Sequence, residues 1–152
     1  MYRSDPDGGP DAKKKGEIMA TITIGIMDPP YESANTPTAF RLVETAIRKG
    51  HNVNVFCYEG ATALGYAGQK QHPNAVHGMS LEEEDHPNPK EWVKSLLALA
   101  AENNVKLVWC NCGLCVDERG VENQVEGTCR GSPVDAWKYC EGSEGVLLIG
   151  TE

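Results

Sequence analysis

Hydrophobic positions follow two different periods along this chain. Runs rich in β-branched and other apolar residues have the character of strands, and they occupy 21–27, 51–58, the segment from 105 onward and 146–149, with room for a further short strand at 124–126. Between them, apolar residues recur every three or four positions, which predicts helices over 36–49, 88–103 and 133–141, with short helices at 60–64 and after 113. Strands that alternate with helices predict a three-layer α/β fold with a mostly parallel sheet of about five strands.

The expected helices carry capping signals at their ends. Thr36-Pro37 and Asn88-Pro89 each combine an N-cap residue with proline at the first helical position. Ser132 precedes Asp135 by three residues, which is the pattern of a capping box. Gly50 is expected just past the end of the first helix. The helix after Ser132 is expected to bury its apolar side chains, which are Val134, Trp137 and Cys140.

The third strand runs into a cysteine-rich stretch, VKLVWCNCGLCVDERGV, at 105–121. The carboxyl ends of strands are where α/β sheets place their functional groups. A thiol at a strand-to-helix junction meets unpaired backbone N–H groups and the positive end of a helix dipole, and both favour the nucleophilic thiolate. We therefore expect Cys112 to be accessible and reactive. The cysteines expected to be buried are Cys57, Cys110 and Cys140.

Length and charge narrow the class of protein. A chain of 152 residues suits one domain, which we place at 19–152 after a polar, disordered tail at 1–18. The net charge of −8 argues against a DNA-binding surface, because the basic cluster 13–15 lies in that tail. No apolar run approaches the roughly 20 residues that span a bilayer, and no export signal is apparent. We expect a cytoplasmic protein with reduced thiols and no membrane partner.

The cysteine spacing is compatible with more than one chemistry. Cys110, Cys112 and Cys115 supply three of the four ligands of a tetrahedral zinc site, and a histidine from 65–87 or Cys129 would have to be the fourth. The pair Cys112 and Cys115 also has redox CxxC spacing, without the proline typical of thioredoxins. A flavin is disfavoured because the loop after the first strand lacks glycine at 33–36. A non-enzymatic metal-binding or adaptor module therefore stays an alternative.

Several motifs carry a resemblance to a known family. The segment Cys112–Gly120, in which a cysteine lies eight residues before a glycine preceded by arginine, is similar to the cysteine motif of the DsrE/TusD-like (DsrE/DsrF-like) sulfur-relay family. The motif Asp28-Pro29-Pro30-Tyr31, the helix with Ala39–Leu42 and the pattern of Lys49–Phe56 resemble the amino-terminal half of that family. The resemblance spans about 21–150. It departs in the longer segment 65–87 and the extra Cys110.

This resemblance implies a sulfur-carrier or sulfurtransferase function without a cofactor or a metal. Cys112 would carry sulfane sulfur as a persulfide, and thiolate attack would pass it between donor and acceptor proteins. Cys115 would either resolve the persulfide as a disulfide or remain a spectator. We expect the N–H groups of Leu114 and Cys115 to hold the sulfur anion and Arg119 to add positive charge.

Two further expectations concern assembly and access. The resemblance implies a homo-oligomer, a trimer or a hexamer, to which apolar loop residues would contribute, namely Leu64, Tyr66 and Met79. The long segment 65–87 is expected to lie over or beside Cys112 as a mobile cover, because loops after parallel strands emerge at the carboxyl edge of the sheet.

Overall fold

A five-stranded parallel sheet forms the centre of the fold. The computed structural model describes residues 19–73, 75–85 and 87–151, so the expected tail at 1–18 lies outside the described residues. Neighbouring strands pair in parallel in the order β4-β3-β2-β1-β5. The strands are β1 (Thr21–Ile26), β2 (Asn52–Cys57), β3 (Leu107–Cys112), β4 (Thr128–Gly131) and β5 (Gly145–Ile149). The prediction of an α/β fold with a parallel five-stranded sheet is confirmed.

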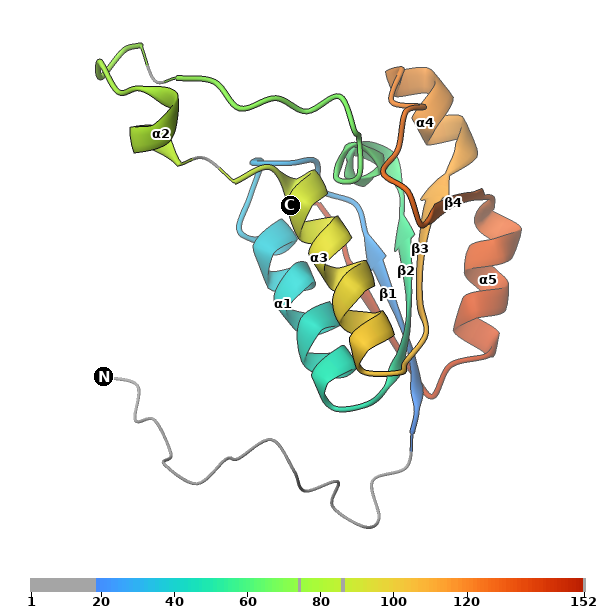
Figure 1. Cartoon of the computed structure of the whole chain (residues 1–152). Coiled ribbons are helices and arrows are strands. Elements are labelled where there is room, and N and C mark those ends of the chain that lie inside the picture. Colours follow the sequence, from blue (N-terminus) through green and yellow to red (C-terminus); the bar gives the residue numbers. More distant parts are fainter. Residues whose placement is uncertain (1–18, 74, 86, 152) are drawn as a thin grey trace, which may run out of the picture.

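Helices cover both faces of the sheet and make three layers. Figure 1 views the sheet nearly edge-on, with α1 and α3 on one side and α5 on the other. Helix α4 continues from the end of β3 beyond the sheet. The helices are α1 (Asn35–Arg48), the 3-10 helix η1 (Glu59–Ala63), α2 (Leu81–Glu84), α3 (Pro89–Glu102), α4 (Gly113–Arg119) and α5 (Pro133–Glu141). Within the part of the chain that the structure describes, no helix is long and apolar enough to cross a membrane.

The capping predictions hold at most helix ends. Gly50 follows α1 with a φ of 81°, and Ser132 forms a capping box with Asp135 at the start of α5. The prediction for Thr36 is wrong, because α1 begins at Asn35, two residues before the predicted first helical residue Pro37, and its N-cap is Ala34. The Ala34 carbonyl accepts the backbone N–H of Thr38 at 3.1 Å, which starts the first helical turn before Thr36. Thr36 is instead buried inside that turn.

The main hydrophobic core lies between the sheet and the helices α1 and α3. Phe40 of α1 packs edge-on against Trp109 of β3, with ring centroids 5.6 Å apart, and against Trp92 of α3 at 4.8 Å. Alternate residues of the central strands point to the same side, as the two-residue period of strands requires. Those buried in this core include Ile24, Ile26, Val53, Val55 and Cys57. This face fixes the strands from which the cysteines of β3 project.

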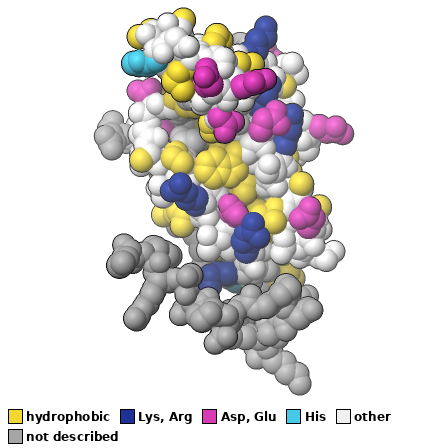
Figure 2. Space-filling view, turned by 60° about the vertical axis from the view of Figure 1, so that its left-hand side comes forward, with side chains coloured by type: hydrophobic (Ala, Val, Ile, Leu, Met, Phe, Trp, Pro, Cys, Tyr) yellow, Lys and Arg dark blue, Asp and Glu magenta, His cyan; other side chains and the backbone are white. Residues whose placement is uncertain are grey.

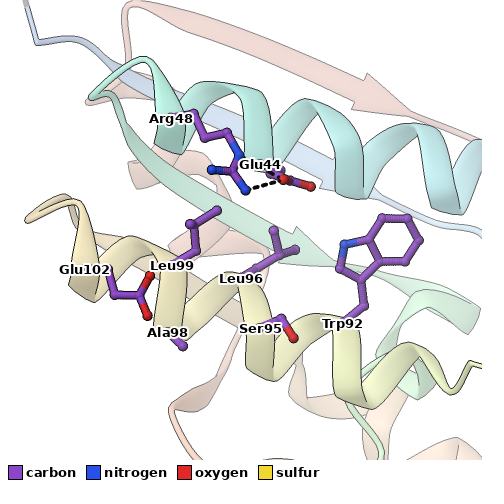
Figure 3. A pocket seen from close by; sticks show the side chains of 8 residues that line it. All are labelled: Glu44, Arg48, Trp92, Ser95, Leu96, Ala98, Leu99 and Glu102. Atoms are coloured by element: carbon purple, nitrogen blue, oxygen red, sulfur yellow. Dashed lines mark hydrogen bonds and ion pairs between the residues drawn. The ribbon is translucent and has the colours of Figure 1, made fainter. Parts of the chain in front are cut away.

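The outer surface of these two helices carries a shallow groove. Hydrophobic side chains gather at the centre of this side of the molecule, with charged side chains around them (Figure 2). The groove has a volume of about 330 Å³. Figure 3 shows Trp92, Leu96 and Leu99 of α3 along it, opposite the ion pair between Glu44 and Arg48 of α1. The groove therefore separates two amphipathic helices and lies away from the cysteines.

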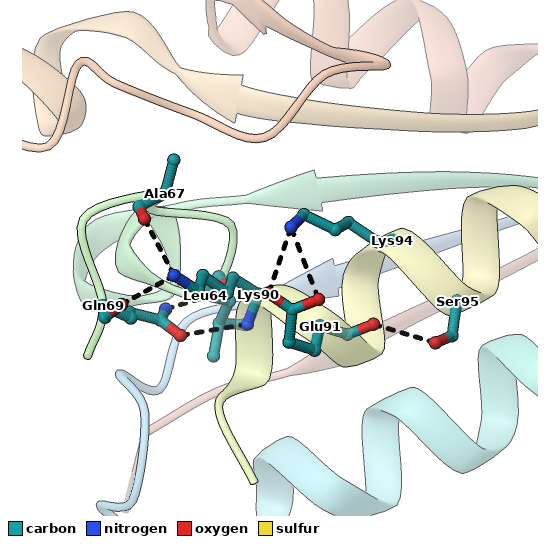
Figure 4. Close-up of polar contacts among 7 residues, drawn as sticks. All are labelled: Leu64, Ala67, Gln69, Lys90, Glu91, Lys94 and Ser95. Atoms are coloured by element: carbon teal, nitrogen blue, oxygen red, sulfur yellow. Dashed lines mark hydrogen bonds and ion pairs between the residues drawn. The ribbon is translucent and has the colours of Figure 1, made fainter. Parts of the chain in front are cut away.

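Hydrogen bonds hold the two ends of the long segment between η1 and α3 close to each other. Lys90 Nζ donates to the carbonyl oxygens of Ala67, at 3.0 Å, and Gln69, at 2.6 Å (Figure 4). The Gln69 side chain also accepts the backbone N–H of Lys90, at 3.0 Å. Helix α2 lies beyond the base that these bonds form, on the side of α1 and α3 and away from α4 (Figure 1). Leu64, expected as an exposed oligomer contact, is fully buried in the main core.

Two predictions for the second half of the chain are wrong, namely the short strand at 124–126 and the buried residues of α5. The short strand expected at 124–126 is only an isolated bridge between Tyr66 and Gln124, and the true edge strand is β4. In α5, Val134 is 61% and Trp137 is 65% exposed, whereas both were expected to be buried. Helix α5 turns Ala136 and Tyr139 toward the sheet instead. Its outward face is left apolar and uncovered in the single chain.

Candidate functional site

Cys112 is the last residue of β3, and α4 begins at the next residue. Because the sheet is parallel, the carboxyl ends of its strands meet at the same edge, and Cys112 lies at that edge. Cys110 and Cys112 are two residues apart and so share a face of β3. With Cys115 and Phe56 they form a small buried cluster on the face that α5 covers.

Cys112 is buried, with only 2% of its surface exposed, so the expectation of an accessible thiol is wrong for this state of the chain. Phe56 and Tyr58, from the neighbouring strand β2 and its end, pack against the cysteine cluster. The expectation of burial is confirmed for Cys57 and Cys110, whereas Cys140 is only half-buried. The strand-to-helix junction is therefore a covered site.

The Cys115 thiol packs with Cys112 in the buried cluster, and a hydrogen bond to the Cys112 sulfur is among the causes that raise the pKa of Cys115. Burial, followed by this hydrogen bond, raises the pKa of Cys115 to about 11, although the backbone N–H of Glu59 donates to its sulfur and opposes the rise. Cys115 is therefore a thiol at neutral pH and acts as a donor toward Cys112. The Cys112 side chain makes no capping hydrogen bond to α4.

Arg119 lies beside this site and is paired with Glu59. Its guanidinium forms an ion pair with the Glu59 carboxylate and donates to the Cys115 carbonyl oxygen at 3.4 Å. Glu59 opens η1 with a φ of 49°, a conformation that is uncommon for a residue with a side chain. The pair fastens α4 to η1 beside Cys115. Arg119 thus lies near the site, with its charge already matched by Glu59.

Tyr58 was missed by the sequence analysis. It directly follows β2, and negative charge on the Cys115 and Cys112 sulfurs, together with the Glu59 carboxylate, raises the pKa of its phenol. The phenol is thus protonated at neutral pH and is available as a hydrogen-bond donor near the sulfurs. The signal that could have identified it is its position at the end of the strand next to β3.

A buried amide lies on the other face of the strand end. Asn111 is fully buried, and its Nδ2 donates to the Gln124 side chain at 3.3 Å. Gln124 in turn donates to the carbonyl oxygens of Thr62, at 2.9 Å, and Val121, at 2.6 Å. The Asn111 Oδ1 atom has no hydrogen-bond partner among the described residues. This network joins β3 to η1 and to the segment after α4, and so supports the backbone on both sides of Cys112.

Cys129, His72 and His77 do not complete a metal site around Cys112, and His86 lies outside the described residues. Cys129 is the strand partner of Cys110, and His72 and His77 are exposed on the long segment. Among residues 19–73, 75–85 and 87–151, no group of three or more His, Cys, Asp or Glu side chains is arranged to hold a metal ion. The structure gives the metal-binding alternative no support.

The side chains that cover Cys112 do not come from the segment 65–87, which was expected to cover it. The apolar side chains packed against the cysteine cluster are Tyr58, Val108, Ala136 and Tyr139, and none of these belongs to 65–87. The described part of that segment is held at its base by Lys90, and α2 lies on the far side of the carboxyl edge from α4 (Figure 1). The cover over Cys112 thus comes from the strand ends and α5.

Comparison with known proteins agrees with this architecture. The DsrE/DsrF-like family matches residues 20–139. The uncharacterized protein MJ0989 of Methanocaldococcus jannaschii is 27% identical over 130 residues, which cover 84% of this chain and 98% of that protein. The crystal structure of the ychN protein from E. coli has the same fold, with a TM-score of 0.64 at 21% identity, over 86% of this chain and 99% of that one. The chain described here belongs to the DsrE/DsrF-like family.

Proposed function

We propose that this chain is a sulfur carrier that accepts sulfane sulfur on Cys112 as a persulfide and passes it to a partner protein. Proteins of the DsrE-like family generally act in sulfur relay together with partner proteins. The observation that carries the proposal is the contact between the Cys112 and Cys115 thiols at the carboxyl edge of β3. All six cysteines are free thiols, as a carrier that works by thiolate attack requires.

The proposed chemistry is thiol exchange and needs no metal. The Cys112 thiolate attacks the outer sulfur of a donor persulfide, so that a new S–S bond forms on Cys112 and the donor leaves as a thiol. An acceptor thiolate then attacks the outer sulfur of the Cys112 persulfide. This second step returns Cys112 to its thiolate form and leaves the persulfide on the acceptor.

The neighbouring groups fit a site that stabilises negative sulfur. Cys115 is held as a thiol donor by its raised pKa, and the Tyr58 phenol is a second donor close by. A hydrogen bond to a charged group contributes about 1.5–3 kcal/mol, so a donor at Cys115 would stabilise the terminal sulfur anion of a persulfide carried by Cys112. The ion pair between Arg119 and Glu59 offsets part of the negative charge that the Glu59 carboxylate places beside Cys115.

The burial of Cys112 suits a carrier that must protect its cargo. A persulfide enclosed by Phe56, Tyr58 and Tyr139 would be shielded from water and from stray thiols. Exchange with a partner would then require an outward movement of the short helix α4 or of Tyr58. A protein partner can supply the binding energy for such a movement, whereas a small molecule such as polysulfide reaches Cys112 only in the fraction of chains that open spontaneously.

We also propose that the chain works as a homo-oligomer in a reducing, cytoplasmic environment with separate donor and acceptor proteins. The apolar side chains that the single chain leaves exposed on α5 and β5 support assembly, because monomers seldom leave large apolar patches in water. They are Val134, Trp137, Val146, Leu147 and Leu148. Sedimentation showing a monomer at micromolar concentration would remove this part of the proposal.

The function is tested by mass spectrometry of the intact chain after incubation with polysulfide. We expect wild type and a Cys140→Ser control to gain about 32 Da per sulfur atom, and a reductant to reverse the gain. The Cys112→Ser variant should gain none at this site. Loading of Cys112→Ser to the level of wild type would refute the assignment.

A further inference from the structure

Strand β4 places a second thiol beside the buried cysteine cluster. Cys129 of β4 is the register partner of Cys110 of β3, and partners in a parallel ladder point to the same face. Cys110 is buried, whereas Cys129 is exposed to solvent. Cys129 is close enough to Cys110 for a hydrogen bond between the thiols to be among the causes that raise the pKa of Cys110. The chain thus holds a second thiol pair, formed by residues that the Cys112 site does not use.

Two residues define the space around the Cys110 sulfur. Tyr139 of α5 packs against the cysteine cluster, and a hydrogen bond from its hydroxyl opposes the rise in the pKa of Cys110. A Cβ atom at Gly131 would lie only 2.5 Å from the Cys110 Sγ atom, so a side chain at that position would displace the sulfur. Glycine at 131 and tyrosine at 139 together give the Cys110 sulfur room beside β4.

We propose that Cys110 and Cys129 form a second dithiol site, which oxidises to a cross-strand disulfide independently of Cys112 and Cys115. Neighbouring strands of a sheet lie about 4.7–4.9 Å apart. A disulfide requires Cα atoms about 4.4–6.8 Å apart. In-register cysteines on β3 and β4 therefore meet the distance requirement without movement of the backbone.

The reaction partner is a low-molecular-weight disulfide, with oxidised glutathione as the probe. The exposed Cys129 thiolate attacks one sulfur of the reagent, a mixed disulfide forms, and one glutathione thiolate leaves. Cys110 loses its proton to water and attacks the Cys129 sulfur, which expels the second glutathione thiolate. Two protein thiols are oxidised, the reagent disulfide is reduced to two thiols, and these take up the two protons.

The second step depends on the environment of Cys110. Burial, followed by its hydrogen bond to Cys129, raises the pKa of Cys110 to about 12. The thiolate of Cys110 is therefore scarce at neutral pH, and closure of the disulfide accelerates as the pH rises toward that value. Once formed, the bond resists thiols, because an attack on the exposed Cys129 sulfur must expel a high-pKa leaving group from Cys110.

The disulfide would act on the Cys112 site through the backbone. It closes a loop of about 20 residues that contains the end of β3, all of α4 and the segment leading to β4. Such a closure should raise the melting temperature by about 6–12 °C. The disulfide would fix the edge strand β4 to β3. Both ends of the segment that contains α4 would then be held in place, which restricts the outward movement of α4 proposed for exchange at Cys112.

The test uses full-length protein with Cys112→Ser and Cys115→Ser, incubated with oxidised glutathione. Remaining thiols are blocked with N-ethylmaleimide in denaturant, and the protein is digested with trypsin. Cleavage after Lys106, Arg119 and Arg130 separates Cys110 from Cys129, on peptides 107–119 and 120–130. We expect these two peptides to be joined, more rapidly at pH 9 than at pH 7, and reductant to separate them. A stable glutathionyl group on Cys129 with Cys110 fully alkylated at both pH values would overturn the proposal.

A second arm keeps the test valid if the double variant does not fold. The same digest is made from wild type and from Cys110→Ser, with circular dichroism as the check on folding. We expect the joined peptides in wild type and their absence in Cys110→Ser. A link that survives in Cys110→Ser would show that Cys112 or Cys115 is the partner of Cys129, and the assignment to Cys110 would be wrong. Both arms measure a disulfide and not a persulfide, so they stand apart from the proposed function.

Discussion

The two faces of the sheet are packed in different ways. On the face under α1 and α3, large side chains such as Trp109 and Phe40 are fully buried in one continuous core. On the other face, the buried cluster consists of Phe56 and three cysteines, and α5 covers only part of the sheet. Leu148, which lies against Gly25 on this second face, is 68% exposed. The comparison indicates that the first face supplies stability, and that the second supplies thiols and a surface for partners.

Paired truncations on the two faces should give the largest contrast. Ile47→Ala removes a fully buried side chain from the first face, and we expect a loss of about 2–5 kcal/mol in the free energy of unfolding. Leu148→Ala, on the second face, should cost less than about 0.5 kcal/mol, because its side chain is mostly in water. Urea unfolding followed by circular dichroism measures both values.

A large loss of unfolding free energy in Leu148→Ala would show that this side chain is buried in solution. It would mean that β5 is covered in solution, and the natural cover would be a second copy of the chain. The loss would then depend on protein concentration, which the loss for Ile47→Ala would not. Equal and concentration-independent losses for the two variants would contradict the division between the faces.

Alkaline pH should weaken the second face. Burial raises the pKa of Cys110 to about 12 and that of Cys115 to about 11, from an ordinary value of 9.0. The folded chain therefore binds these protons more tightly than the unfolded chain does. Their contribution to stability is complete below pH 9 and is lost as the pH rises from about 9 to about 12, by an amount on the order of a few kcal/mol.

Urea midpoints measured across this pH range check the prediction. Cys110→Ala should reduce the slope of stability against pH above 9, whereas its curve and that of wild type should run parallel between pH 6 and 8. Parallel curves over the whole range would show that Cys110 does not remain protonated in the folded chain.

The contrast between the faces also explains what the sequence could predict. Strands β1, β2 and β3 are apolar because at least one face of each is packed, and their apolar character is visible in the sequence. Strand β5 is equally apolar in sequence, although Val146, Leu147 and Leu148 are exposed in the single chain. The edge strand β4 reads Thr-Cys-Arg-Gly and carries no such signal, because its pairing is held by the backbone and by its partner β3. It was therefore placed several residues too early.

The site could be predicted only in part, for a similar reason. The junction after Cys112 follows from local signals, namely an apolar strand, a glycine and a helical segment. The burial of Cys112 depends on Tyr58 and Phe56, which arrive from β2 by strand pairing and are distant in sequence. The pairing of Arg119 with Glu59 likewise spans 60 residues. Contacts of this kind leave no periodic signature.

Two replacements of Cys115 should separate its role as a donor from its role as a thiol. Cys115→Ala removes the hydrogen bond to Cys112, and we expect persulfide formation to slow at least about tenfold, since a hydrogen bond to a charged group contributes about 1.5–3 kcal/mol. Cys115→Ser keeps a donor and should load at nearly the wild-type rate. The measurement is the rate of mass gain with polysulfide. If the two variants load equally slowly, a hydrogen-bond donor at position 115 does not set the rate; a persulfide that lasts longer in both variants than in wild type would instead identify Cys115 as a resolving thiol.

The smallest effect is expected from the long segment. Deletion of 71–85 leaves Gln69 and Lys90, which tie the base together, and removes no residue that packs against the cysteine cluster. We expect the shortened chain to fold and to hold its persulfide against glutathione as long as the full chain does. A persulfide lost several times faster would show that this segment does shelter Cys112.

The most direct test of the account is to locate the added sulfur within the folded chain. Protein treated with polysulfide is alkylated in denaturant and digested with trypsin, and the peptide 107–119, which contains Cys110, Cys112 and Cys115, is sequenced by mass spectrometry. The account predicts an additional sulfur between the alkyl group and Cys112, with Cys110 and Cys115 alkylated directly. Sulfur carried by Cys115, or by the exposed Cys129 alone, with Cys112 unmodified, would contradict it.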